Sequence, residues 1–389
     1  MMPSALQLAS VWIGTALAAI ALAYALIAWL AVRFWRGAPA GSVPARAVPS
    51  ASAPPAVTVL KPLCGADPGT YECLRSFCLQ RYPGLQIVCG VSDALDPAAA
   101  VVRRLQREFP ALQLELVIDA RQHGSSLKVS NLINMMAQAR HDHLVVSDSD
   151  VRVAPDYLAG LIPEVDQSGV GIVTCAYRGR ARGGFWSLLL ALFINDWFMP
   201  SVFVSALLGS QAFVSGATIA LRRTTLAAIG GFAAIADQLA DDYKLGELTR
   251  RLGLRTVLSR VRVETDVSEP SAADLLRHEL RWLRTIRAVR PASYACSFVT
   301  FSVPVAALGC LLAGMSTGSL MLLALTGIVR VMLHFANRGA DSALMQLTVL
   351  PFNDLLAFGL WCWGFASRRV HWRERRYRVA RDGSVRPIP

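Results

Sequence analysis

Long apolar runs lie at both ends of the chain, and short apolar runs alternate with polar stretches between them. From Leu6 to Val32 there is no charged residue, and about 20 apolar residues are enough for a helix to cross the hydrocarbon core of a membrane. The pattern therefore predicts an N-terminal transmembrane anchor within residues 1–36. A cleaved signal peptide is the alternative, but no basic region precedes the run, and Arg33 and Arg36 follow it.

Long apolar stretches also occupy much of the last hundred residues. Residues 292–329 carry no charge and fit two spans if the chain breaks near 315–319, and a third apolar stretch covers 343–366. We expect transmembrane or re-entrant helices over 291–367 and a basic cytoplasmic tail over 368–389.

The charges beside these runs predict their orientation, because Lys and Arg are enriched on the cytoplasmic side of a membrane. Arg33 and Arg36 follow the first span, which predicts an outside N-terminus and a cytoplasmic middle segment. Three complete spans after that segment would place the basic tail outside, in conflict with the same rule. One of the three C-terminal stretches is therefore expected to be re-entrant or interfacial, and the pattern does not distinguish among them.

The middle of the chain has the pattern of an α/β domain. A linker rich in Pro, Ala and Ser covers 37–56 and is expected to be flexible or extended. Over 57–290, short apolar runs alternate with helix-like stretches, which predicts a mostly parallel sheet with helices between its strands. The predicted strands cover 57–61, 85–93, 112–119 and 143–150.

Acidic residues follow two of these strands, at the edge where such sheets bind ligands. Asp93 ends the second strand, and Asp148 and Asp150 end the fourth. Two carboxylates so close raise each other's proton affinity unless a cation or strong donors compensate, so the pair predicts a metal site. An ordinary turn also explains Asp93, and a loop that caps a following helix also explains Asp148 and Asp150.

Two further features have both a functional and a structural explanation. Asp241 and Asp242 precede a helix-like stretch, where acids also stabilise a helix N-terminus. The apolar segment 185–208 is interrupted by Asn195, Asp196 and Pro200. We expect a helix and hairpin in the membrane interface there, anchored by Trp186 and Trp197, with a buried core helix as the alternative.

Composition narrows the class of protein. Hydrophobic residues make up 54% of the chain and charged residues 17%, which is too apolar for an ordinary soluble enzyme. The net charge of +12 invites a nucleic-acid interpretation. Much of the basic excess, however, adjoins apolar segments at 277–290 and 368–381, where Lys and Arg meet anionic lipid. A membrane is therefore the predicted partner, and nucleic acid is not.

Taken in order, the motifs of the middle segment resemble a known enzyme family. They are VTVLKPLCGADP (57–68), GVSD (90–93), SLKVSNLIN (126–134), SDSD (147–150), SGATIALRR (215–223), IGGF (229–232), ADDYKLGE (240–247) and RHELRWLRTIR (277–287). The set resembles the inverting nucleotide-sugar glycosyltransferases that include cellulose, chitin and hyaluronan synthases. It is more similar to the ceramide glucosyltransferase branch, and most similar to bacterial hopanoid biosynthesis-associated glycosyltransferases. The resemblance covers residues 57 to about 300 and implies a GT-A α/β domain flanked by transmembrane helices.

The resemblance implies a role for each acid. Asp93 matches the residue that binds the uracil of a UDP-sugar. Asp150 matches the metal-binding acid of the DxD motif, and Asp148 beside it contacts the ribose or the metal-bound water. A Mg²⁺ or Mn²⁺ ion would bridge these carboxylates to the diphosphate. Asp242 matches the catalytic base, with Asp241 as its companion.

The resemblance also implies residues outside the acids. Arg281 and Trp282 match the RW of a (Gln/Arg)xxRW signature that holds the diphosphate and the acceptor, whereas His278 replaces the Gln or Arg. This departure favours a single transfer over polymer extension and leaves the role of His278 open. An amphipathic basic helix on the membrane also explains the run. From the other motifs the resemblance implies Lys61, Lys128 and Gly216 as substrate-binding residues, together with Asp93, Asp148 and His278.

The predicted function is a membrane-bound transfer of one hexosyl unit from a UDP-sugar to a lipid hydroxyl. The resemblance implies N-acetylglucosamine and a hopanoid, bacteriohopanetetrol, in a bacterial-type inner membrane with a cytoplasmic catalytic domain. Transfer of glucose to ceramide is the alternative. A processive polysaccharide synthase would need more spans and the full RW signature. A transporter or scaffold would be expected to lose the acids, and here Asp150 and Asp242 are present.

Overall fold

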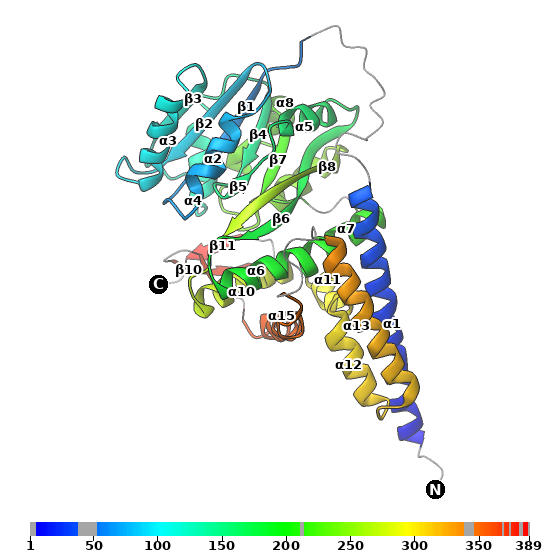
Figure 1. Cartoon of the computed structure of the whole chain (residues 1–389). Coiled ribbons are helices and arrows are strands. Elements are labelled where there is room, and N and C mark those ends of the chain that lie inside the picture. Colours follow the sequence, from blue (N-terminus) through cyan, green and yellow to red (C-terminus); the bar gives the residue numbers. More distant parts are fainter. Residues whose placement is uncertain are drawn as a thin grey trace. The chain divides into compact units, whose positions relative to one another are not determined.

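The computed structural model describes residues 5–37, 53–210, 214–337, 346–367, 369–372, 375–380 and 384–387. It divides into two compact units (Figure 1). The helical unit comprises residues 1–37, 189–209 and 271–376, and the sheet unit comprises 38–188, 210–270 and 377–389. Most of the predicted linker and part of the predicted basic tail lie outside the described residues.

The sheet unit contains an eight-stranded sheet with the order β3-β2-β1-β4-β7-β6-β8-β5. Its strands are β1 (Val57–Pro62), β2 (Leu85–Val91), β3 (Gln113–Ile118), β4 (His143–Ser147), β5 (Val151–Arg152), β6 (Val170–Ala181), β7 (Thr218–Arg222) and β8 (Arg255–Val267). The four strands expected from the sequence are confirmed, and they pair in parallel.

The other half of the sheet is mixed. β7 is antiparallel to both β4 and β6, β6 is parallel to β8, and β5 is antiparallel to β8. The parallel pairing expected from the sequence therefore holds among β1 to β4 and between β6 and β8, and the other three pairs are antiparallel. The alternating pattern that supported it covers residues up to 150, and beyond that point long excursions separate the strands.

Helices cover both faces of the sheet (Figure 1). Two clusters of buried apolar side chains form its cores. Val59 of β1 packs in one cluster and its neighbour Leu60 in the other, as expected for a central strand buried on both sides. The helices are α2 (Thr70–Cys78), α3 (Pro97–Glu108), α4 (Leu127–Met135), α5 (Tyr157–Val165), α8 (Arg223–Ala228), η2 (Phe232–Ile235) and α9 (Asp241–Arg251). Side-chain caps at Asp96 and Ser126 fix where α3 and α4 begin.

The helical unit is built around the N-terminal helix. Its elements are α1 (Ala5–Gly37), η1 (Ile194–Phe198), α7 (Met199–Leu207), α10 (Ala272–Val289), α11 (Pro291–Cys296), η3 (Ser297–Thr300), α12 (Ser302–Leu312), α13 (Thr317–Asn337), α15 (Leu350–Gly364) and β9 (Arg369–Trp372). At Gly14 and Gly309, α1 and α12 approach so closely that a Cβ on Gly14 would lie 2.4 Å from the Gly309 carbonyl oxygen. Small residues allow such close helix packing in membranes.

In the part of the chain that the structure describes, three helices are long and apolar enough to cross a membrane: Ala5–Trp35, Phe185–Leu207 and Thr317–Asn337. The pair Pro291–Thr300 and Ser302–Leu312 passes the same test but bends by 74°. Helix α15 has 15 residues, which at 1.5 Å per residue is about 22 Å long. It is shorter than the hydrocarbon core of a bilayer, about 30 Å.

The segment 185–207 is helical throughout and contains no hairpin. Helix α6 (Phe185–Phe193) continues through the π-helical turn η1 into α7. The residues expected to break the segment do not reverse the chain. Asn195 and Asp196 are buried within the π turn, and Pro200 lies in the first turn of α7, where a missing N–H is tolerated.

Candidate active site

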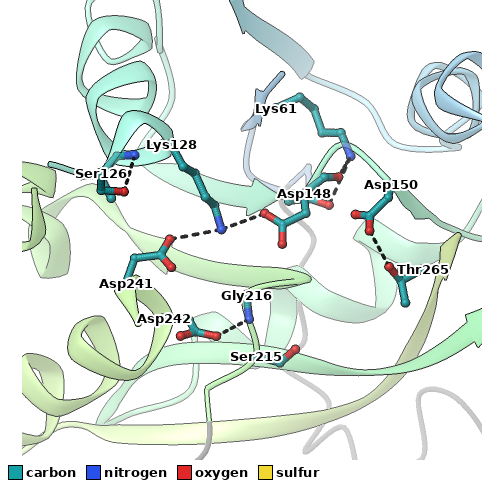
Figure 2. Close-up of polar contacts among 12 residues, drawn as sticks. Lys61, Ser126, Lys128, Asp148, Asp150, Ser215, Gly216, Asp241, Asp242 and Thr265 are labelled. Atoms are coloured by element: carbon teal, nitrogen blue, oxygen red, sulfur yellow. Dashed lines mark hydrogen bonds and ion pairs between the residues drawn. The ribbon is translucent and has the colours of Figure 1, made fainter. Parts of the chain in front are cut away.

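A lysine at the start of α4 joins two of the predicted site acids. The side chain of Ser126 caps α4, which places Lys128 in its first turn. The Nζ of Lys128 lies 2.8 Å from Asp148 Oδ1 and 3.1 Å from Asp241 Oδ2 (Figure 2). Burial alone would lower the pKa of Lys128, but Asp148 and Asp241 raise it above its ordinary value. Lys128 therefore stays cationic and balances part of the negative charge.

Asp242 is held by backbone donors. The N–H of Gly216 donates to Asp242 Oδ2 at 2.9 Å, and the N–H of Tyr243 donates to Oδ1 at 2.7 Å. Burial, followed by the charge of Asp241, raises the pKa of Asp242 to about 7. A carboxylate with such a pKa is suited to accept a proton near neutral pH.

Gly216 lies where these acids converge (Figure 2). A Cβ on this residue would lie 3.2 Å from Asp242 Oδ2, and 3.6 Å from both Asp148 Oδ2 and Lys128 Nζ. The fold thus brings together residues from the loop before β7, the loop after β4, helix α4 and helix α9. The side chain of Asp148 remains 35% exposed, so a ligand can reach it.

Asp150 is supported from β8. The hydroxyl of Thr265 donates to Asp150 Oδ2 at 2.8 Å, and the N–H of Asp266 donates to the Asp150 carbonyl at 2.9 Å. Burial and the neighbouring Asp148 raise the pKa of Asp150 to about 6. The short strand β5 follows Asp150, so the alternative in which this loop caps a helix is wrong.

Lys61 lies buried beneath the Asp148 backbone. Its ammonium group donates to the Asp148 carbonyl oxygen and lies 3.4 Å from Ser147 Oγ. Burial lowers the pKa of Lys61 to about 8. Its contacts fix the loop that carries the acids rather than the acid side chains themselves.

The site fits a divalent cation only in part. Among the described residues, no group of three or more His, Cys, Asp or Glu side chains is arranged to hold a metal ion. Asp148 and Asp150 offer carboxylate oxygens, and Mg²⁺ sites typically combine one or two carboxylates with substrate phosphates and water. The donor set therefore fits a cation that arrives with a diphosphate.

Asp93 has turn contacts. Its carboxylate accepts a hydrogen bond from Leu95 N at 2.9 Å and is exposed. This contact matches the turn explanation, and a role in binding uracil stays a prediction. Asp96, which the sequence analysis did not single out, accepts from Gly65 N at 3.0 Å with both carboxylate oxygens and caps α3. The following Pro97 at the first helical position was the available signal.

The RW residues belong to the helical unit. His278, Arg281 and Trp282 lie on α10, and the Trp282 ring contacts the rings of His278 and Phe198 at centroid distances of 4.8 and 5.7 Å. Their predicted contribution to the acidic site of the sheet unit stays a prediction.

Comparison with known sequences decides the family. The sequence model of glycosyl transferase family 21 matches residues 13–385. The chain belongs to glycosyl transferase family 21. The predicted relationship to ceramide glucosyltransferases is thereby confirmed at the level of the family.

Two curated relatives of this family-21 chain carry the same name. Ceramide glucosyltransferase 1 of Caenorhabditis elegans is 23% identical over 238 residues, which cover 61% of this chain and 51% of the relative. Ceramide glucosyltransferase of Candida albicans is 30% identical over 114 residues, covering 26% of this chain and 21% of the relative. The chain spans about half the length of the first relative and less of the second.

A solved structure resembles this family-21 chain in fold. The mannosyltransferase PcManGT of Pyrobaculum calidifontis, in complex with GDP-Man and Mn²⁺, matches with a TM-score of 0.52 and 18% identity. The match covers 92% of this chain and 97% of the mannosyltransferase. The predicted glycosyltransferase fold class is confirmed.

Proposed function

We propose that this protein transfers one hexosyl unit from a UDP-sugar to the hydroxyl of a membrane lipid, with glucose and ceramide as the favoured pair. The observation that carries the proposal is the meeting of Asp148, Asp241 and Asp242 around Lys128 and Gly216, in a chain of family 21. We favour ceramide over a hopanoid as the acceptor because the two relatives described above are named as ceramide glucosyltransferases. N-acetylglucosamine transfer to bacteriohopanetetrol remains the competing outcome.

Asp242 acts as the general base in this proposal. It takes the proton of the acceptor hydroxyl as the hydroxyl oxygen forms a bond to the anomeric carbon. The bond from that carbon to the diphosphate breaks with its electron pair, and UDP leaves. The Gly216 and Tyr243 N–H groups orient the carboxylate so that one face is presented to the acceptor.

Positive charge at the site is proposed to stabilise the leaving diphosphate. Asp148 and Asp150 would hold Mg²⁺ or Mn²⁺ against the diphosphate, and the cation would supply positive charge where negative charge develops. Thr265 orients Asp150 by its hydrogen bond, and Lys61 fixes the loop from beneath. Arg281 is proposed to pair with the departing diphosphate, for which a planar, always charged guanidinium is suited.

The location in a membrane follows from the apolar helices. We propose that α1, the bent pair Pro291–Thr300 and Ser302–Leu312, and α13 cross the bilayer, because each passes the test for a membrane span and α1, α12 and α13 pack against one another. Helix α15 is then the stretch that does not cross, which leaves the basic tail on the same side as Arg33. The sheet unit is cytoplasmic in this arrangement, and the bacterial-type inner membrane predicted with the hopanoid stays a prediction.

Substitution of the proposed catalytic base should separate sugar transfer from UDP binding. Asp242→Asn removes the proton acceptor and keeps the size of the side chain, although its amide oxygen can accept from only one of the two N–H groups, so transfer should fall by at least about 10³-fold. UDP affinity in the presence of Mn²⁺, measured by calorimetry, should change less than about threefold. The matched substitution Asp237→Asn lies outside the acidic site and should leave turnover near wild type. Normal turnover by Asp242→Asn would show that the base is misassigned.

A further inference from the structure

A second polar cluster lies in the helical unit, among helices long and apolar enough to cross a membrane. Arg330 donates from Nη2 to Asp354 Oδ1 at 2.7 Å and from Nε to Oδ2 at 3.0 Å. Asp196 Oδ2 lies 2.6 Å from His334 Nδ1. The Asp196 and His334 side chains have no exposed surface, and that of Arg330 is 8% exposed. Ionisable groups inside membrane segments are costly and typically functional.

A cavity of about 20 Å³ adjoins this cluster. Its polar lining comes from Tyr24, Asp196, Thr300, Ser302, Arg330 and Asp354, and the rest of the wall combines alanines such as Ala25 with larger side chains such as Phe301 and Leu333. A volume of this size holds one water-sized group. A polar group that reaches the cavity therefore meets hydroxyls and charges on one side and apolar surface on the other, as in small-molecule sites.

One donor of the cluster forms an ion pair but no hydrogen bond of good geometry. Arg330 Nη1 lies 3.5 Å from Asp196 Oδ2 without forming a hydrogen bond, and no other residue in the described part of the chain accepts one from this buried atom. A buried donor without a hydrogen-bond partner is destabilising. Because Arg330 lines the cavity, an oxygen that enters can accept this hydrogen bond.

Position and charge restrict the occupant. Arg330 lies seven residues before the end of α13, which is about 10 Å along the helix axis, so it is nearer the end of α13 that is cytoplasmic in the proposed topology. Asp196 and Asp354 place two carboxylates beside one guanidinium, and they repel an anion. A neutral lipid therefore fits better than one with a phosphate.

We propose that this cavity binds a hydroxyl or amide oxygen of a neutral membrane lipid, with Arg330 Nη1 as the donor. Within the proposed function, which this inference deepens, the occupant is the acceptor lipid or a lipid of its class. The site lies wholly in the helical unit and is distinct from the acids of the sheet unit. It would retain an acceptor in the membrane while its reacting hydroxyl is presented elsewhere.

Filling the cavity tests the proposal without breaking the ion pairs. Ala25→Val adds two methyl groups to the wall, and Ala21→Val adds the same groups one turn earlier on α1, at a position that is equally buried but does not line the cavity. Both changes are made in the full chain carrying Asp242→Asn, reconstituted in phosphatidylcholine nanodiscs. The probes are a photoactivatable ceramide and a phosphatidylglycerol with the same photoactivatable chain.

The expected result is at least a fivefold loss of ceramide crosslinking in Ala25→Val and little change in Ala21→Val, with weak crosslinking of phosphatidylglycerol throughout. Equal ceramide crosslinking in both variants, or stronger crosslinking of the anionic lipid, would overturn the proposal. If Ala25→Val lowers the melting temperature more than Ala21→Val, Tyr24→Phe is judged by the same criterion, because it removes only a hydroxyl from the lining.

The crosslinking test does not depend on turnover. A selective loss in Ala25→Val supports the lipid site even if the wild-type chain transfers no sugar to ceramide. Unchanged crosslinking overturns the site even if transfer to ceramide is observed. Failure of the inference and failure of the proposed function are thus separate results.

Discussion

Asp242 combines two features that ordinarily oppose ionisation. It is half-buried and largely desolvated, and the neighbouring Asp241 carries a like charge. Lys128 and the N–H groups of Gly216 and Tyr243 act in the other direction. The balance raises the pKa of Asp242 to about 7, so that a modest change in pH converts the proposed base into its inactive, protonated form.

The pH dependence of transfer follows from this pKa. A raised pKa means that Asp242 is protonated below about pH 7, so turnover should rise with pH and level off above about pH 8. Below the pKa, the loss should approach tenfold per pH unit. Turnover measured at saturating donor and cation between pH 5.5 and 8.5 checks this expectation. A flat profile would argue against Asp242 as the base.

Thr265 orients Asp150 through one hydrogen bond. A hydrogen bond to a charged group contributes about 1.5–3 kcal/mol, so Thr265→Val should raise the Mn²⁺ concentration needed for half-maximal activity by about tenfold or more. Thr265→Ser keeps the hydroxyl and should behave like the wild type. The two variants are compared by Mn²⁺ titration of transfer. An unchanged Mn²⁺ requirement in Thr265→Val would remove Thr265 from the site.

At the scale of elements, the sequence predicts what depends on local pattern. β1 to β4 lie where the alternation of apolar runs placed them, because a strand buried on both faces needs a continuous apolar run. Asp148 and Asp241, about ninety residues apart, both contact Lys128. The order of motifs indicated that they belong to one site, but the lysine contact depends on the packing of α4 and α9.

Other elements depend on contacts that no local pattern reveals. Thr265 lies within the long strand β8 and meets Asp150 only because β8 pairs with β5. The π turn η1 replaces an expected hairpin because the polar Asp196 finds buried partners on α13. Local rules predict a break at Asn195, Asp196 and Pro200, and the tertiary contacts of Asp196 offset that preference.

The close approach of α1 and α12 is a testable property of these elements. A Cβ on Gly309 would lie 2.5 Å from the Gly14 carbonyl oxygen and 2.8 Å from Ala18 N, so Gly309→Ala must push two backbones apart. The expected loss is about 1–3 kcal/mol, seen as a lower melting temperature in detergent. Gly327→Ala meets nothing within 4 Å and should be neutral or slightly stabilising. Equal melting temperatures would contradict the close packing.

At the scale of the whole molecule, membership in family 21 joins a sugar-transfer fold to apolar helices. The proposed topology places three crossings before the basic tail. It resolves the conflict between the number of apolar stretches and the charge rule, because α15 is proposed not to cross. An enzyme of this arrangement can take a soluble donor from one side and an acceptor that never leaves the membrane.

The topology makes opposite predictions for two tags. An epitope inserted after Met315, between α12 and α13, should be reached by antibody in intact spheroplasts. An epitope at the C-terminus should be reached only after the membrane is permeabilised. Both chains are checked for turnover, which serves as the control for folding. Antibody access to both tags in intact spheroplasts would mean that α15 crosses the membrane.

The identity of the product tests the central claim most directly. The purified chain in bilayers with Mn²⁺ is offered UDP-glucose and UDP-N-acetylglucosamine separately, each with ceramide or bacteriohopanetetrol, and the lipid products are identified by mass. We predict a hexosylceramide that requires the divalent cation and is absent with Asp242→Asn. An N-acetylhexosamine on bacteriohopanetetrol would keep lipid glycosyl transfer and replace the proposed pair. UDP release without any glycosylated lipid would contradict the account.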